Sequence, residues 1–287
     1  MRISNKYILL LIFAIFATSC IHDDFEIVGD DRTPLESRSL ISFVTERSGG
    51  IISLSIDAPV QDRFNVWIDL NNDGIRSGNG AEDITVFNKY QDYQISLGVN
   101  KVTLHGDITY LAAASNELIT INISKNPFLK ILNVPFNRLT SIDLSKNTAL
   151  VNLDCSDNNI NSIDLSHNKS LETLWVYNNQ LTTLTVSDNT ALTFLDCSGN
   201  QLKKLDLSNN SELVHLLCYN NQLSSLDISQ NNMLNRIWAF DNPFSTNESV
   251  SLIGSLQKVS QGDLWISNEL LSTEQLDILT KKGWEIN

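Results

Sequence analysis

Apolar and polar positions recur with a fixed spacing along most of this chain. Between residues 99 and 244 the chain follows a frame with apolar residues at positions 1, 4 and 6 and asparagine at position 9. One copy places Leu150, Leu153, Cys155 and Asn158 in these positions. The framing asparagines are residues 116, 126, 137, 147, 158, 168, 179, 189, 200, 210, 221, 231 and 242. Their spacing alternates between 10 and 11 residues, so the repeat is 21 residues long and contains two related halves.

The spacing of apolar positions predicts a β-rich repeat solenoid. Positions 1, 4 and 6 point inward and stack on the same positions one coil away, and each full burial contributes roughly 1.5–3 kcal/mol. The asparagine is expected to end a short strand, where its amide pairs with backbone groups that are otherwise buried without partners. We therefore predict a mainly β stack of short parallel strands.

This repeat resembles the leucine-rich repeat over about residues 99–244. Cys155, Cys197 and Cys218 share one strand position, and in this the repeat resembles the cysteine-ladder repeats of the internalin J class of bacterial adhesins. The resemblance implies a horseshoe-shaped solenoid and suggests adhesion. We interpret the three cysteines as small buried apolar residues. A Cys197–Cys218 disulfide is geometrically conceivable, whereas no histidine or acid lies at a spacing that predicts metal binding or catalysis.

Two regions flank the repeats. Residues 39–98 contain alternating segments such as 52–56 and 65–68, which predict a small antiparallel β-domain packed on the first coil. Residues 245–287 predict an α/β cap that covers the last coil, with a helix at 252–258 and a strand at 264–266. A second helix is expected to open with a capping box at Ser272 and to end at Gly283.

The N-terminal region contains one loop with a metal-binding pattern. Residues 69–75 match D-x-N-x-D-G, in which oxygen ligands at alternate positions and a glycine bend suit Ca²⁺. The candidate ligands are Asp69, Asn71, Asp73, Ile75 and Glu82. Glu82 comes two residues later than the twelfth position of an EF-hand loop, and no helices are expected beside it. Two interpretations stay open: a structural calcium site, or a hairpin turn that uses these residues for their backbone preferences. No other cofactor is expected.

The first 38 residues predict export and lipid anchoring. Arg2 and Lys6 precede an apolar run too short to span a bilayer, and small residues follow it. Residues 17–20, Ala-Thr-Ser-Cys, resemble the lipobox of bacterial lipoproteins. The resemblance implies that residues 1–19 are a signal peptide, that Cys20 carries the lipid, and that residues 20–38 form a tether. An acidic pair follows Cys20 and resembles the surface-export signals of some Gram-negative lipoproteins, which favours the outer face of the outer membrane. A periplasmic location and an ordinary signal peptide are the alternatives.

The charge and the missing motifs exclude other functions. The net charge is −13, and without residues 1–19 it is −15, because 18 basic residues then face 33 acidic ones. Such a surface repels phosphate backbones, so we expect no nucleic-acid partner, and membrane contact only through the lipid. The chain has no nucleophile-elbow motif, no ligand-spaced histidine pair and no glycine-rich phosphate loop, so we predict a non-enzymatic protein. We expect a monomer.

Comparison of the repeats with one another locates a variable surface. The half without cysteine is monotonous, with recurring Asp and Ser, whereas outward positions of the cysteine half vary. Because neighbouring coils lie about 4.8 Å apart, these positions form one surface, here called the variable face. Its candidate ligand-binding residues are Trp175, Tyr177, Phe194, His215, Tyr219, Arg236, Trp238, Phe240, Asp154 and Asp196. An exposed aromatic cluster of this kind usually marks a binding site. The alternative is that some rings pack on the cap or on each other.

Two hypotheses for the partner follow. The first is an extracellular protein, bound in adhesion or another protein–protein interaction. The second is a glycan, with sugar rings stacked on Trp175, Tyr177 and Trp238 and with Asp154 and Asp196 accepting hydrogen bonds from hydroxyl groups. Spaced, coplanar rings favour a glycan, and a packed apolar patch with a polar rim favours a protein.

Overall fold

The computed structural model describes residues 39–266 and 271–286. The predicted signal peptide, the lipid-carrying Cys20 and the tether lie outside these residues, so the structure leaves those predictions untested. No helix within the described ranges is long and apolar enough to cross a membrane.

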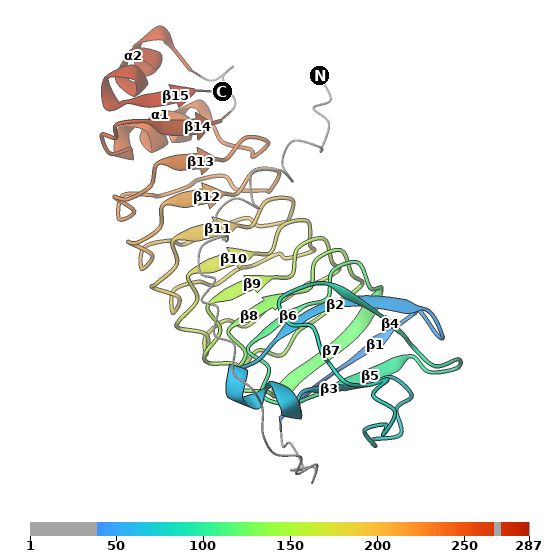
Figure 1. The fold of residues 1–287 in the computed structure, drawn as a ribbon. Helices are drawn as coiled ribbons and strands as arrows, with labels where there is room; N and C mark the ends of the chain where they lie inside the picture. The colour runs from blue at the N-terminus through green and yellow to red at the C-terminus, as the bar shows by residue number, and fades with distance from the viewer. Residues whose placement is uncertain (1–38, 267–270, 287) are drawn as a thin grey trace. The chain divides into compact units, whose positions relative to one another are not determined.

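The repeats form a leucine-rich-repeat solenoid with one three-residue strand per coil (Figure 1). The strands are β6 (Tyr110–Ala112), β8 (Ile131–Asn133), β9 (Asn152–Asp154), β10 (Thr173–Trp175), β11 (Phe194–Asp196), β12 (His215–Leu217) and β13 (Arg236–Trp238). Neighbouring strands are parallel and in register, with partners 21 residues apart, as in Leu153–Leu174 and Leu174–Leu195. The period read from the sequence is therefore the period of the structure.

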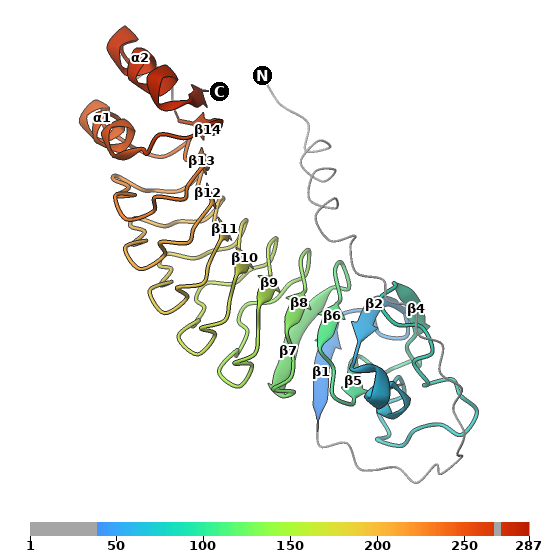
Figure 2. The same cartoon turned by 60° about the vertical axis from the view of Figure 1, so that its left-hand side comes forward.

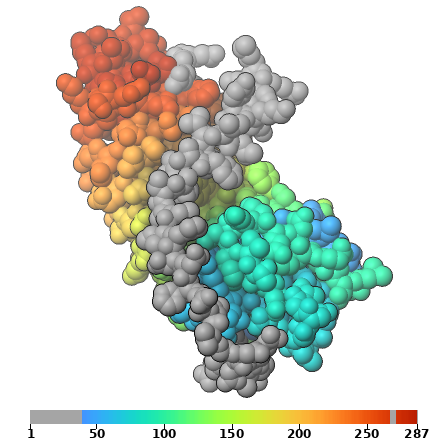
Figure 3. All heavy atoms as spheres, in the orientation of Figure 1, coloured from blue at the N-terminus to red at the C-terminus, as the bar shows by residue number. Residues whose placement is uncertain are grey.

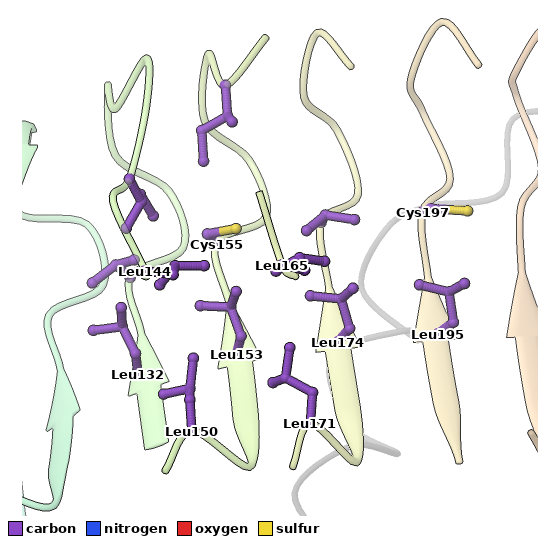
Figure 4. Packing of buried hydrophobic residues seen from close by; sticks show 14 of the residues in the cluster. Leu132, Leu144, Leu150, Leu153, Cys155, Leu165, Leu171, Leu174, Leu195 and Cys197 are labelled. Carbon is purple, nitrogen blue, oxygen red and sulfur yellow. The ribbon is translucent and has the colours of Figure 1, made fainter. Parts of the chain in front are cut away.

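The core consists of stacked inward side chains. Leu153, Leu174 and Leu195 are fully buried and lie at the same height on successive coils (Figure 4). Cys155, Cys197 and Cys218 are free thiols and fully buried, which confirms their interpretation as small core residues. Burial raises the pKa of each of these thiols, so none of them is a ready nucleophile.

Beyond the first coil, only the cysteine half of each repeat forms a strand; in the first coil the other half also forms one, β7 (Leu118–Lys125). The other half runs through turns, and its aspartates lie at the surface. Asp143, for example, accepts a hydrogen bond from the backbone N–H of Ser145, and Asp164 accepts one from Ser166. The recurring aspartates of this half therefore pair with neighbouring serines and face solvent.

The framing asparagines fall into two classes that the sequence does not distinguish. The strand-side asparagines (116, 137, 158, 179, 200, 221 and 242) lie four residues beyond a strand and use both ends of the amide. Asn200, for instance, accepts from the Leu181 N–H and donates to the Val176 carbonyl. The turn-side asparagines (126, 147, 168, 189, 210 and 231) donate to carbonyls, but their Oδ1 atoms have no partner among the described residues.

The N-terminal β-domain is hydrogen-bonded into the solenoid. A four-stranded sheet has the order β3-β5-β1-β7, from β3 (Trp67–Asp69), β5 (Lys101–His105), β1 (Leu40–Thr45) and β7 (Leu118–Lys125). A short 3₁₀ helix, η1 (Val60–Asn65), connects β2 (Ile51–Asp57) to β3. β2 pairs antiparallel with β6, the first repeat strand, and its other edge pairs antiparallel with β4 (Gln91–Gln94). The sequence predicted packing on the first coil; in the structure β2 also lies beside β6 as its neighbour in one sheet (Figure 2).

The C-terminal cap continues the parallel sheet. It contains α1 (Thr246–Ser255), β14 (Gly262–Trp265), α2 (Thr273–Lys282) and β15 (Trp284–Ile286), with β14 paired to β13. α1 begins after the Ser245 cap and ends at Ser255, so the predicted bounds of 252–258 were wrong at both ends. α2 has the predicted capping box at Ser272, and Gly283 ends it in the left-handed conformation at φ 82°. In the space-filling view the cap and the β-domain lie at opposite ends of the packed coils (Figure 3).

Candidate functional site

The variable face consists of side chains that point outward from the parallel strands. The first residue of the three-residue strands contributes Thr173, Phe194, His215 and Arg236. The last residue of the strands contributes Asp154, Trp175, Asp196 and Trp238. Tyr177, Tyr219 and Phe240 follow two residues beyond their strands. Strand alternation aims these side chains away from the leucine core, as the repeat comparison predicted.

The aromatic residues of this face are half-buried rather than fully exposed. Trp175, Tyr177, Phe194, His215, Tyr219, Trp238 and Phe240 all have intermediate exposure. The prediction of an exposed cluster was therefore wrong in its degree of exposure, because most of these rings cover one another. They form two groups of contacting rings, not a set of isolated anchors.

Two chains of ring contacts build this surface. Trp175 lies 4.9 Å from Phe194, centroid to centroid, and Phe194 lies 5.9 Å from His215 at 90°. Tyr219 stacks on Phe240 at 4.6 Å and 6°. Phe240 contacts Trp265 at 4.6 Å, and Trp238 meets the same ring edge-on at 5.6 Å. The contacts of Trp238 and Phe240 with the cap are those that the alternative interpretation anticipated.

The cap contributes two residues to this face that the sequence reasoning missed. Asp263 and Trp265 of β14 pair in register with Arg236 and Trp238 of β13. Asp263 Oδ2 accepts hydrogen bonds of 3.0 Å from both Arg236 Nε and Trp238 Nε1. The signal was Asp-Leu-Trp, an outward–inward–outward triplet like Arg-Ile-Trp, but its offset of 27 residues instead of 21 hid the equivalence.

The two predicted aspartates differ in environment. Asp154 is half-buried, whereas Asp196 is 7% exposed. Oδ1 of each accepts hydrogen bonds from the backbone N–H and hydroxyl of the serine two residues on, Ser156 and Ser198 respectively. Burial raises the pKa of the Asp196 carboxyl to about 7, and the charges of Asp154 and Asp157 add to this. One oxygen of each carboxylate is therefore already committed to its own turn, and Asp196 is not the exposed sugar-binding group of the glycan hypothesis.

Asp157 is a third carboxylate at this site and was not predicted. It lies at a left-handed position, φ 50°, three residues after Asp154, and Asn178 Nδ2 donates to its Oδ1 at 2.8 Å. Burial raises its pKa too. Comparison of this turn position across coils could have found it, because the position is occupied by Asp, Asn, Gly, Asn and Asp at residues 157, 178, 199, 220 and 241.

The candidate calcium loop is closed by its own backbone. Asp69 accepts from the N–H groups of Asp73 and Gly74, and both oxygens of the buried Glu82 accept N–H groups, from Leu70 and Ser77. Within the described ranges no three His, Cys, Asp or Glu side chains are grouped to hold a metal ion. The predicted calcium site also includes oxygen atoms of Asn71 and of the Ile75 carbonyl, which do not belong to these four kinds of side chain. Calcium binding by this loop therefore stays a prediction.

Comparisons with known proteins find similar solved structures only. No protein-family model matches the chain, and no curated protein matches it. The functional domain of InlJ from Listeria monocytogenes, described as including a cysteine ladder, is 35% identical over 47% of this chain, with a TM-score of 0.41. A leucine-rich-repeat protein of Leptospira interrogans is 23% identical over 60% of the chain, with a TM-score of 0.48. An internalin, inlF, from Listeria monocytogenes is 16% identical over 62%, with a TM-score of 0.35.

These matches cover parts of the other chains. This chain spans 35% of the InlJ chain, 53% of the Leptospira chain and 86% of the inlF chain. All three TM-scores lie below 0.5, so we base the function on this chain's own residues.

Proposed function

We propose that this protein binds another protein through the variable face. The observation that supports this is the packing of the rings against one another. Tyr219 and Phe240 stack face to face, and Phe240 and Trp238 both contact Trp265. Two groups of packed rings on one face, with Arg236 and aspartates beside them, have the composition of a protein interface, in which aromatic residues and arginine supply most of the binding energy.

The same packing speaks against a glycan as the main partner. Sugar rings need free, flat aromatic faces, but Phe194 is contacted by Trp175 at 38° and by His215 at 90°. Asp196, which the glycan hypothesis assigned to hydroxyl recognition, is nearly buried and bonded to Ser198. We therefore propose binding without catalysis, and glycan capture becomes an outcome of the test.

We also propose that the protein is a lipoprotein anchored through Cys20 and displayed on the outer face of the outer membrane. The support is the sequence alone: the Ala-Thr-Ser-Cys tetrapeptide and the acidic pair after it. Incorporation of labelled palmitate into the wild type but not into Cys20→Ser is the expected result. Digestion of the protein on intact cells by added protease is expected for outer-face display, and protection on intact cells would contradict it.

The binding proposal is tested with variants copied from the protein's own repeats. The double variant Trp175→Asn, Tyr177→Ser installs the residues found at equivalent positions in other coils, Asn133 and Ser156. The matched control, Thr185→Asp, changes the monotonous half and restores its usual residue there. Detergent-solubilised full chain is titrated against purified extracellular proteins and polysaccharides.

We expect a protein partner that binds the wild type and Thr185→Asp equally. Its affinity for the double variant should fall roughly 30-fold or more, which corresponds to about 2 kcal/mol for an interface hot spot. A polysaccharide lost in the double variant would move the function to glycan capture. Equal binding by all three proteins would show that the variable face is not the site.

A further inference from the structure

Three carboxylates gather at one end of the variable face. Asp154 on β9 and Asp196 on β11 occupy the same outward column, and Trp175 on β10 lies between them. Asp157 lies in the turn after β9, hydrogen-bonded by Asn178. We call Asp154, Asp157 and Asp196 the acidic cluster.

The acidic cluster has no counter-charge of its own. Within the described ranges, none of its three carboxylates forms an ion pair with a lysine, arginine or histidine. Asp196 is more than nine-tenths buried, and its Oδ1 is taken by Ser198. No described residue donates a hydrogen bond to its Oδ2, although the side chain points outward from its strand toward the face. This oxygen is not among the buried side-chain atoms that lack a partner, so it still reaches the surface of the face, where a cation or a donor can meet it.

The aspartates of the other half provide an internal comparison. Asp206 has the same turn, in which its Oδ1 accepts the backbone N–H of Ser208 at 3.0 Å. Asp206 is exposed, and its hydrogen bonds with Ser208 lower its pKa, whereas burial raises the pKa of Asp196. The local sequence motif is therefore not what makes Asp196 unusual. The cause is its position among covering rings and two like charges.

Aromatic rings surround the acidic cluster. Trp175 separates Asp154 from Asp196, and Tyr177 and Tyr219 lie within electrostatic reach of Asp157 and Asp196. Ring faces attract cations through their quadrupole, and carboxylates form strong charge-assisted hydrogen bonds with ammonium and guanidinium groups. Rings and carboxylates together form a receptor for a cationic side chain.

We propose that the acidic cluster, with Trp175 and Tyr177, receives a lysine or arginine side chain of the protein partner. This inference rests on the proposed function, because it names the chemistry that the same face recognises. The other end of the face already contains an internal pair, Arg236 with Asp263. The lysine or arginine of the partner, its cationic anchor, is therefore expected at the β9–β11 end of the face. Its position there determines how the partner is oriented along the solenoid.

The test uses synthetic peptides of defined charge. The probe is acetyl-Gly-Gly-Arg-Gly-Gly-amide, together with its lysine version and a citrulline version, which has the shape of arginine without the charge. Full chain is titrated at low salt, because screening weakens such contacts, and tryptophan fluorescence and calorimetry report binding. We expect saturable binding of the two cationic peptides at about millimolar concentrations and at least tenfold weaker binding of citrulline.

Two variants separate the cluster from general charge. Asp196→Asn is expected to weaken arginine-peptide binding at least tenfold, and the matched control Asp206→Asn, the same replacement in the same kind of turn, is expected to leave it unchanged. Asp157→Asn, at a turn position that tolerates asparagine, gives a second reading if Asp196→Asn fails to fold. Absence of saturable binding by the wild type, equal binding of citrulline, or equal loss in Asp206→Asn would overturn the proposal.

The outcomes also separate this proposal from the previous one. If a protein partner is lost in Trp175→Asn, Tyr177→Ser but Asp196→Asn binds that partner and the arginine peptide normally, the variable face is correct and the cationic anchor is wrong. If the arginine peptide needs Asp196 but no protein partner needs the rings, the cationic receptor stands and the proposed function fails.

Discussion

The two classes of framing asparagine should differ in what their removal costs. Asn200, a strand-side asparagine, accepts the Leu181 N–H at 3.0 Å and donates to the carbonyls of Val176, Cys197 and Ser198. Asn189, a turn-side asparagine, only donates, to the carbonyls of Leu165 and Asn168. Both are buried, and Asn→Ala removes the same atoms from each.

The magnitudes follow from which backbone groups lose their last partner. In Asn200→Ala, the Val176 and Cys197 carbonyls keep donors from Asn179 and Asn221, but the buried Leu181 N–H keeps none. A buried unsatisfied donor costs about 1–3 kcal/mol beyond the net loss of about 0.5–1.5 kcal/mol per hydrogen bond. In Asn189→Ala, the Leu165 and Asn168 carbonyls keep the N–H groups of Asn168 and Leu171, and an unpaired Oδ1 disappears.

We therefore expect Asn200→Ala to lower the free energy of unfolding by about 2 kcal/mol more than Asn189→Ala does. Urea unfolding of the full chain, followed by far-UV circular dichroism, measures the difference. Hydrogen exchange locates it, because the Leu181 amide should exchange much faster in Asn200→Ala alone. Equal costs within about 0.5 kcal/mol, or an unchanged Leu181 amide, would show that Oδ1 acceptance is not what distinguishes the classes.

Three further predictions concern the core, the acidic cluster and the calcium loop. Leu195→Ala, in the fully buried column, should lower the free energy of unfolding by about 2–5 kcal/mol, and a cost below about 1 kcal/mol in urea melts would mean that this column is not close-packed. The pKa of Asp196 is raised to about 7, above the value near 3.9 of an unfolded aspartate, so the native state holds a proton that the unfolded chain releases. Stability should therefore fall as pH rises from about 4 to about 7, and the fall should be smaller in Asp196→Asn, which lacks this contribution; parallel pH profiles of the two proteins would contradict it. If residues 69–82 bind Ca²⁺, calcium at about 100 times its Kd should add about 2.7 kcal/mol, and Asp73→Ala should abolish the gain. Identical melting in calcium and in chelator would instead support the simple hairpin turn.

Much of the fold could be predicted from the sequence because the repeat constrains side chains locally. An inward leucine must meet another inward leucine one coil away, so the 21-residue spacing of Leu153, Leu174 and Leu195 predicts both the strand register and the core. The Ser272 capping box and Gly283 fix the limits of α2 for similarly local reasons. The predicted start of α1 was wrong, because the apolar residues at 252 and 253 mark its buried face and not its first turn, which begins beyond Ser245.

The sequence predicted which side chains of the candidate site point outward, but not how deeply their neighbours bury them. Strand alternation determines that Trp175, Asp196 and Trp238 point outward, and the sequence alone showed this. Their burial depends on the volume of side chains 19 or 27 residues away, which no local pattern contains. Phe194 covers Trp175 from the next coil, and Trp265 covers Trp238 from the cap.

The sequence by itself determined the period, the inward core and the variable face, since each follows from the alternation of side chains along one coil. Only the tertiary structure decided which asparagine oxygens find a donor, how the N-terminal strand β2 joins β6, and that Asp196 is enclosed near two other carboxylates. The physical reason is the same in each case. Hydrogen-bond satisfaction and desolvation are properties of atoms brought together from different coils, and they exist only after the coils have stacked.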